Sequence, residues 1–287
     1  MDGHDAPMTS RVVVSWLRGG LGNQMFEYAV GRAVALRQER ALWLDDTPLL
    51  SDPPGTTHRD YCLDIFDIKA QRLSGASPTR PVVLVRVVET SPGFHPEVLA
   101  PSPYSHIYLQ GFWQDPRYFA DIETVLRNDF AIVPGIRSPA FENWHRAMAR
   151  SPDPVCVHVR RRDYLTTASG ARLGFVGEDY YKRAIAFMSA RLPRAEYFVF
   201  SDDIAWCREA LRLREPHFFV STEYDPRSFR NDFELMASCR HFIIANSTFS
   251  WWAAWLGGAP GKIVLLPETW ARNESLRPSR PDGWVAI

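Results

Sequence analysis

The second half of the chain alternates short apolar runs with longer amphipathic segments at nearly regular spacing. From Val155 onward, each run of a strand's length is followed by a segment whose apolar positions recur with a helical period. Such alternation is typical of α/β folds, because two parallel strands need a crossover connection that a helix usually supplies. The sequence therefore predicts parallel sheets, and ligand sites are expected where their strands end.

This patterning also gives the expected elements and domains. The predicted strands are 12–17, 41–44, 107–109, 155–159, 197–200, 217–220, 242–245 and 263–266. The predicted helices are 23–38, 118–129, 139–150, 179–191, 204–213, 228–239 and 248–256. Two prolines in 151–154 prevent a helix from continuing there, so we expect one Rossmann-like domain in 1–150 and a second in 151–287.

The overall charge does not point to a charged partner, and the cysteines, read as free buried thiols, fit a reducing compartment. Lys plus Arg and Asp plus Glu are 33 each, which gives no reason to expect nucleic acid or an anionic membrane. The cysteines (Cys62, Cys156, Cys207 and Cys239) lack metal-ligand spacing. No apolar run reaches the roughly 20 residues of a membrane span, and residues 1–11 lack signal-peptide features. We expect a cytoplasmic protein; peripheral association with the inner membrane and the oligomeric state stay open.

A cluster of arginines follows the strand that ends at Val159. His158, Arg160, Arg161 and Asp163 lie in one short stretch, and arginine forks bind phosphates bidentately. This indicates a di- or polyphosphate site; the alternative is a solvated run of charge. Because side chains alternate along a strand, His158 and Arg160 should share one face and Arg161 the other, which leaves room for one structural arginine. Asp163 either orients an arginine or acts chemically.

A glycine turn follows the first predicted strand and opens a helix. Its glycines let backbone amides approach an anion or a sugar. Gly20-x-Gly22 also matches the start of a dinucleotide-binding fingerprint, with Asp45 or Asp46 as the ribose-binding acid. Met25 stands where the third small residue should be, so that match is partial. An ordinary strand-to-helix turn is the remaining alternative.

Two further strand ends carry polar side chains. Of Asp202 and Asp203, one is expected to cap the next helix, and the other suits the adjacent N–H donors of guanine better than a metal ion. The later helix start offers amides and hydroxyls to an anion, or else is an ordinarily capped helix. Its residues are Asn246, Ser247, Thr248 and Ser250. Trp251 and Trp255 are expected to face the core.

Together these segments resemble the bacterial alpha-1,2-fucosyltransferases of glycosyltransferase family 11. The stretches that carry the resemblance begin at Gly19 (GGLGNQMFEYA), Gln110 (QGFWQ), Tyr118 (YF), His158 (HVRRRD), Tyr180 (YY, before a helix), Phe200 (FSDD) and Asn246 (NSTFSWWAAW). The resemblance implies a GT-B architecture of two facing Rossmann-like domains with a cleft between them. It also implies that the N-terminal domain binds the acceptor and that the C-terminal domain binds GDP-fucose. The C-terminal tail is expected to pack back on the N-terminal domain. No metal or other cofactor is implied.

The resemblance also implies roles for residues. Arg160 would touch the β-phosphate and, with Asp163, is the catalytic candidate, while His158 would lie near the nucleoside. The other implied donor-binding residues are Arg161, Asp202, Asp203, Asn246, Ser247, Thr248, Ser250, Gly20, Gly22, Asn23 and Gln24. The base that takes the acceptor proton stays unassigned, with Asp163, Glu178 and Asp115 as candidates.

The function expected from these features is inverting transfer of L-fucose from GDP-fucose to the 2-hydroxyl of a galactoside-like acceptor, either an oligosaccharide or a lipid-linked glycan. Two alternatives remain open. One is an NAD(P)-dependent oxidoreductase built on the glycine turn, and the other is a sugar-nucleotide or glycan-binding protein without turnover.

Overall fold

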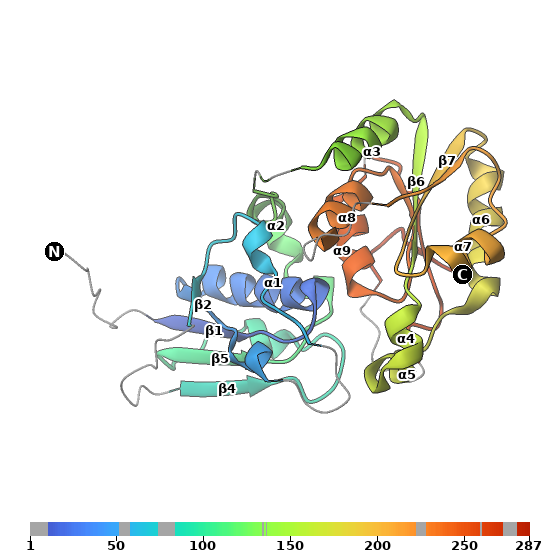
Figure 1. The fold of residues 1–287 in the computed structure, drawn as a ribbon. Coiled ribbons are helices and arrows are strands. Elements are labelled where there is room, and N and C mark those ends of the chain that lie inside the picture. The colour runs from blue at the N-terminus through green and yellow to red at the C-terminus, as the bar shows by residue number, and fades with distance from the viewer. Residues whose placement is uncertain are drawn as a thin grey trace. The chain divides into compact units, whose positions relative to one another are not determined.

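The computed structural model consists of two compact units (Figure 1). The residues it describes are 11–51, 58–73, 84–133, 135, 137–221, 228–258, 260–271 and 280–287. Among these, the first unit runs to Ala131 and the second begins at Ile132. The boundary expected from the two prolines lies later, at residue 150. The helix before that point, α3 (Pro139–Arg150), belongs to the second unit and packs against α8 (Ser228–Ala237).

The first unit is built on a parallel sheet with the strand order β3-β2-β1-β5-β4. Its strands are β1 (Val12–Trp16), β2 (Ala41–Asp45), β3 (Gln71–Arg72), β4 (Leu84–Val88) and β5 (His106–Gln110). Its α-helices are α1 (Leu21–Arg37) and α2 (Glu123–Asp129), with short 3-10 turns at Thr47–Leu50, Leu63–Ile65, Pro96–Leu99, Pro116–Tyr118 and Ala120–Ile122.

Helix α1 packs directly on β1 and β2 through a glycine. A Cβ on Gly31 would lie 2.9 Å from the Leu42 side chain and 3.0 Å from that of Ser15, so only glycine allows this approach. The dinucleotide fingerprint gives this packing role to its third glycine, at the position that Met25 occupies here. In this chain the close contact therefore lies further along the helix, away from the turn.

The second unit is built on a parallel sheet with the order β11-β10-β9-β6-β7-β8. Its strands are β6 (Asp153–Val159), β7 (Ala195–Ser201), β8 (His217–Phe219), β9 (His241–Ile243), β10 (Val264–Leu266) and β11 (Val285–Ala286). Its other helices are α4 (Arg162–Thr166), α5 (Ala168–Leu173), α6 (Gly177–Arg191), α7 (Ile204–Ala210) and α9 (Thr248–Leu256). Strand β6 is central, which places the arginine stretch in the middle of one sheet edge.

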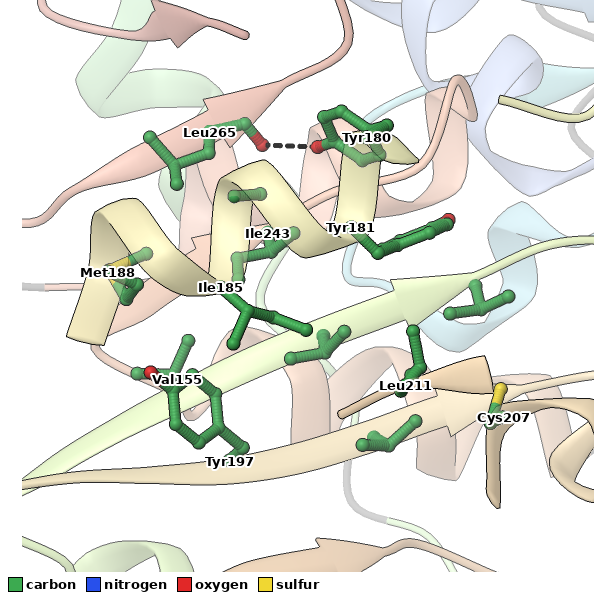
Figure 2. Close-up of a cluster of buried hydrophobic side chains, with 14 of the residues drawn as sticks. Val155, Tyr180, Tyr181, Ile185, Met188, Tyr197, Cys207, Leu211, Ile243 and Leu265 are labelled. Carbon is green, nitrogen blue, oxygen red and sulfur yellow. Dashed lines mark hydrogen bonds between the residues drawn. The ribbon is translucent and has the colours of Figure 1, made fainter. Parts of the chain in front are cut away.

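A buried cluster joins α6 to one face of this sheet (Figure 2). Val155, Val157 and Val159 of β6 point into it, as strand alternation requires. Tyr180 is fully enclosed, yet its hydroxyl hydrogen is shared between the backbone oxygens of Ile244, at 2.6 Å, and Leu265, at 3.2 Å; Figure 2 draws the second contact. Its polar atom is thereby satisfied, and α6 is fixed across β9 and β10.

Most predicted elements are present, and the differences are local. Every predicted strand and helix overlaps an observed element, with ends that differ by a few residues. The prediction lacked β3, β4, β11, α4 and α5. Strand β11 pairs with β10, so the chain's last residues form an edge of the second unit's own sheet, a pairing the prediction did not include.

No helix in the described ranges is both long and apolar enough to cross a bilayer. Residues 1–10, which the signal-peptide argument concerned, lie outside the described part of the chain, as do 52–57 and 74–83.

Candidate functional site

The site in the second unit lies at the carboxyl ends of β6, β7 and β9. These strands are neighbours, and the pairing of His158 with Phe200 and Val159 with Ser201 brings the ends of β6 and β7 level. Residues that directly follow the two strands therefore meet. Arg160 and Arg161 directly follow β6, and Arg162 is the first residue of α4.

Arg160 is held by a carboxylate and an aromatic ring. Its Nε donates to Asp163 Oδ1 at 3.1 Å, and its Nη2 donates to Asp163 Oδ2. The guanidinium lies 5.3 Å from the centroid of the Tyr164 ring, and the Tyr164 hydroxyl donates to the backbone oxygen of Asn246 at 2.7 Å. Burial is the largest single influence and disfavours the charge, but the Asp163 hydrogen bond and the nearby Tyr164, Asp163 and Asp202 groups together outweigh it and raise the pKa of Arg160. Arg160 is thus a fixed, charged and partly accessible cation, with 27% of its side chain exposed.

Arg161 faces the other way and fits a structural role. Its Nη1 donates to Asp203 Oδ2 at 2.6 Å, and its guanidinium lies over Trp206 at 5.5 Å and Phe175 at 5.8 Å. The alternation expected from the strand is confirmed, since Arg160 and Arg161 contact different side chains on different elements.

The two aspartates after β7 have separate tasks. Asp203 Oδ1 accepts from the N–H of Trp206 at 3.2 Å, so Asp203 caps α7, and this bond lowers the pKa of its carboxyl. Asp202 accepts from the backbone N–H groups of Arg161 at 2.9 Å and Arg162 at 3.0 Å. It therefore ties the start of α4 to the end of β7 and remains exposed to solvent.

His158 is a buried neutral imidazole on the Arg160 side. Its residue is 9% exposed, and its ring lies 6.1 Å from that of Phe249 in α9. Burial, together with the positive charge of Arg160, lowers the pKa of His158 to about 3. Its Nδ1 has no hydrogen-bond partner among the described residues. A buried nitrogen of this kind is available to a ligand.

The start of α9 lacks a side-chain cap, which was one of the two alternatives left open by its sequence. Ser247 occupies the cap position, but its Oγ accepts no bond from the helix and is buried without a partner in the described chain. Ser250 Oγ donates to the Ser247 oxygen at 3.2 Å. Asn246 Nδ2 donates to the oxygens of Gly174 and Trp270, both at 2.8 Å, which orients its side chain. The start of α9 thus keeps the Ser247 hydroxyl and the backbone amides of its first turn for an anion.

The glycine turn of the first unit is arranged around two amide side chains. Gly19 has φ +80°, and a Cβ there would lie 2.4 Å from Asn23 Nδ2, while Gly20 precedes α1 and Gly22 lies in its first turn. Gln114 donates to Asn23 Oδ1 at 3.1 Å. Gln24 is fully buried: it donates to the oxygens of Gly19 and Asp60 and accepts from Cys62 N–H. Gln24 therefore braces the 58–62 segment.

The acids proposed for a dinucleotide ribose are already bonded. Asp45 accepts from Thr47 N–H and from the Tyr108 hydroxyl, while Asp46 binds Arg72. Neither is arranged as a vacant ribose acceptor.

The candidate bases are likewise paired. Asp115 is 1% exposed and holds Arg117 through both oxygens, and Glu178 pairs with Lys182 at 2.7 Å. With Asp163 bound to Arg160, the base stays unassigned.

Sequence reasoning missed several residues at these edges. Tyr164 and Trp206, which hold the arginines, were not singled out, although Tyr164 follows Arg160 by four positions. Glu27 and Glu89 of the first unit were also missed. Glu27 is fully buried with Oε1 unbonded to described residues, and burial raises its pKa well above the usual value.

Comparisons with known proteins agree on one family. The model of glycosyl transferase family 11 matches residues 98–287. An alpha-1,2-colitosyltransferase of Escherichia coli is 31% identical, covering 96% of this chain and 99% of its own. A galactoside alpha-(1,2)-fucosyltransferase 2 of Bos taurus is 27% identical, covering 94% of this chain and 77% of its own.

Solved structures show the same fold at low identity. The fucosyltransferase NodZ from Bradyrhizobium matches with a TM-score of 0.55 and 16% identity, over 86% of this chain and 94% of its own. NodZ soaked with GDP-fucose matches with a TM-score of 0.52 and 16% identity, over 86% and 93%. The predicted fold class, α/β of GT-B type with two Rossmann-like domains, is confirmed.

Proposed function

Because this chain belongs to glycosyl transferase family 11, we propose that it transfers L-fucose from GDP-fucose to the 2-hydroxyl of a galactoside-like glycan, with inversion. The bovine relative's name supports the linkage and the galactoside, and the NodZ complex supports the donor. The observation that carries the proposal is the charged, half-buried Arg160 beside a helix start with unused polar groups. That combination suits a diphosphate.

The proposed role of Arg160 follows from how charge moves in the reaction. As the bond between fucose and the β-phosphate lengthens, negative charge grows on the departing GDP. A cation already fixed by Asp163 and Tyr164 stabilises that charge without reorganising, and so do the amides and Ser247 hydroxyl at the start of α9. On this proposal the protein itself supplies the positive charge and no metal ion is required.

His158 and Asp202 are proposed to contact the nucleoside. The unbonded Nδ1 of His158 can exchange a hydrogen bond with it, and the neutral ring adds no charge. Each Asp202 oxygen already accepts one backbone amide but keeps a second lone pair for the N–H groups of guanine. Arg161 and Asp203 are proposed to act only by holding this edge together.

A second donor is favoured by one relative. The alpha-1,2-colitosyltransferase aligns with nearly the whole chain at higher identity than the bovine fucosyltransferase. GDP-colitose differs from GDP-fucose in lacking the 3-hydroxyl of the sugar. It would use the same diphosphate and guanine contacts, so it is the alternative donor for this site.

A donor-by-acceptor screen tests the proposal. The protein would be incubated with GDP-fucose or GDP-colitose and with lactose, methyl β-D-galactopyranoside or a lipid-linked glycan, and the products identified by mass spectrometry. We expect one GDP-sugar to give a product with an alpha-1,2 linkage, equally in the presence of EDTA. Loss of all activity in EDTA, restored by a divalent ion, would contradict metal independence. Binding of GDP without any product from either donor would contradict the transferase proposal.

A further inference from the structure

Four side chains gather at the carboxyl edge of the first unit's sheet, and the donor chemistry uses none of them. Trp16 ends β1, and Arg18 follows it; Glu89 follows β4, and Phe112 follows β5. Strands β1, β5 and β4 are consecutive in a parallel sheet, so their ends meet along one edge. Such an edge is where open α/β sheets bind ligands.

Two of the four form an aromatic surface. The rings of Trp16 and Phe112 meet edge-on with centroids 6.2 Å apart, and Phe112 is 37% exposed. The Arg18 guanidinium lies 5.8 Å from the centroid of Trp16. Water in contact with an exposed aromatic ring is unfavourable, so a ligand that covers the ring gains free energy. A galactose ring can cover it, because one of its faces consists mainly of C–H groups.

The loop that presents Phe112 is strained and firmly held. Buried Trp113 has φ 51°, in the left-handed region, which costs a non-glycine residue about 1 to 3 kcal/mol. Glu89 Oε2 fixes the loop by accepting from the N–H groups of Phe112 at 2.7 Å and Trp113 at 3.3 Å. A Cβ on Gly111 would lie 2.4 Å from that of Glu89, so glycine is needed there. Such strain persists where the surroundings fix it, and it concentrates at ligand sites.

Polar atoms beside the aromatic surface complete a sugar site. Glu89 uses Oε2 for the loop, while Oε1 makes no hydrogen bond to the described residues. The Arg18 guanidinium supplies several N–H donors on the Trp16 side. Pockets that bind small polar ligands combine such an apolar surface with a few placed polar groups.

We propose that Trp16, Arg18, Glu89 and Phe112 bind the acceptor sugar, a neutral pyranose whose C–H face lies on Phe112 and whose hydroxyls bond to Glu89 and Arg18. The inference rests on the glycosyl transfer proposed above and adds the residues that select the acceptor. The Glu89 carboxylate disfavours an acidic sugar at this position.

Phe112→Ala tests the proposal by two readouts. Saturation-transfer NMR with methyl β-D-galactopyranoside reports binding without turnover, and steady-state kinetics with lactose report use of the acceptor. We expect the NMR signal to be lost and the KM for lactose to rise about 10-fold, at unchanged KM for GDP-fucose and unchanged slow hydrolysis of GDP-fucose. Phe112→Tyr should retain both. Leu50→Ala, which truncates a side chain 83% exposed in the same unit, should change neither.

Glu89→Gln provides a second variant that keeps one oxygen for the loop amides. We expect it to weaken galactoside binding several-fold, with a circular dichroism spectrum like that of the wild type. An unchanged galactoside signal and lactose KM in Phe112→Ala would overturn the proposal, and so would a wild-type protein that binds GDP but no pyranose. Because the NMR readout needs no donor, absence of transfer with bound galactoside would count against the proposed function alone.

Discussion

The carboxyl edges of the two sheets carry different side chains, although both sheets are parallel. The edge of the second unit presents the Arg160 cation, the neutral His158 and an uncapped helix start. The corresponding edge of the first unit presents the rings of Trp16 and Phe112, the Arg18 guanidinium and the carboxylate of Glu89, whose pKa burial raises. Both parallel sheets place the ends of their strands along one edge. The few residues that follow each strand determine whether that edge can bind a diphosphate or an uncharged polyol.

The largest expected effect comes from removing the cation on which this contrast depends. Arg160→Ala should lower kcat/KM about 10²- to 10³-fold, since a preorganised group at the leaving diphosphate is lost. Galactoside binding, followed by NMR, should be unchanged. Arg191→Ala is the control, because Arg191 is an exposed arginine of α6 that lies over Phe187. Full activity in Arg160→Ala would show that the edge of the second unit does not stabilise the leaving diphosphate through this cation.

His158 should make the stability of the protein sensitive to acid. Its folded pKa of about 3 lies below the ordinary value of 6.5, so between these pH values the unfolded chain binds a proton that the folded chain does not. Its contribution is therefore complete above pH 6.5, and the free energy of unfolding falls below it by up to about 1.4 kcal/mol per pH unit. Urea denaturation at several pH values between 7.5 and 5 gives the free energy of unfolding, which should change less with pH in His158→Gln than in the wild type. An equal change with pH in the two proteins would show that the His158 imidazole is in contact with water.

The smallest expected effect comes from Ser247→Ala, which tests whether the Ser247 hydroxyl binds the ligand or caps its helix. Ser247→Ala should weaken GDP binding about 3- to 10-fold at unchanged stability, because its hydroxyl caps nothing. Ser138→Ala removes a cap on α3, where Ser138 Oγ accepts from Phe141 N–H at 3.1 Å, so it should cost about 1 kcal/mol of stability and leave GDP binding intact. Calorimetric titration and urea denaturation measure both variants. If Ser247→Ala destabilised the protein without weakening GDP binding, Ser247 would be an ordinary helix cap and not part of the GDP site.

Much of the fold and of the site could be predicted from the periodicity of the strands. Alternation along β6 predicted that Arg160 and Arg161 diverge, and the order of strands and helices predicted two parallel sheets. Strand β4 was missed although 82–88 reads VVLVRVV, a β-branched run whose signal was available. Helices α4 and α5 were missed because their Thr, Ser and Gly residues disfavour helix locally.

Other features depended on contacts that periodicity does not encode. Asp202 and Asp203 are adjacent acids after one strand, and only the three-dimensional arrangement shows which one reaches α7 and which one reaches Arg161 N–H. Asp115 looked available until its pairing with Arg117 was seen. Gln24 looked like a ligand contact, yet its partners come from residues 60 and 62, beyond any local pattern.

The bridge from Asp202 to two peptide N–H groups has a consequence for how this edge can evolve. Those bonds join the Asp202 carboxylate to main-chain atoms, so they do not depend on the identity of the side chains at positions 161 and 162. The backbone that follows Arg160 is therefore anchored independently of the Arg160 side chain, and a lineage could replace that guanidinium to suit a new nucleotide sugar while the backbone keeps its path.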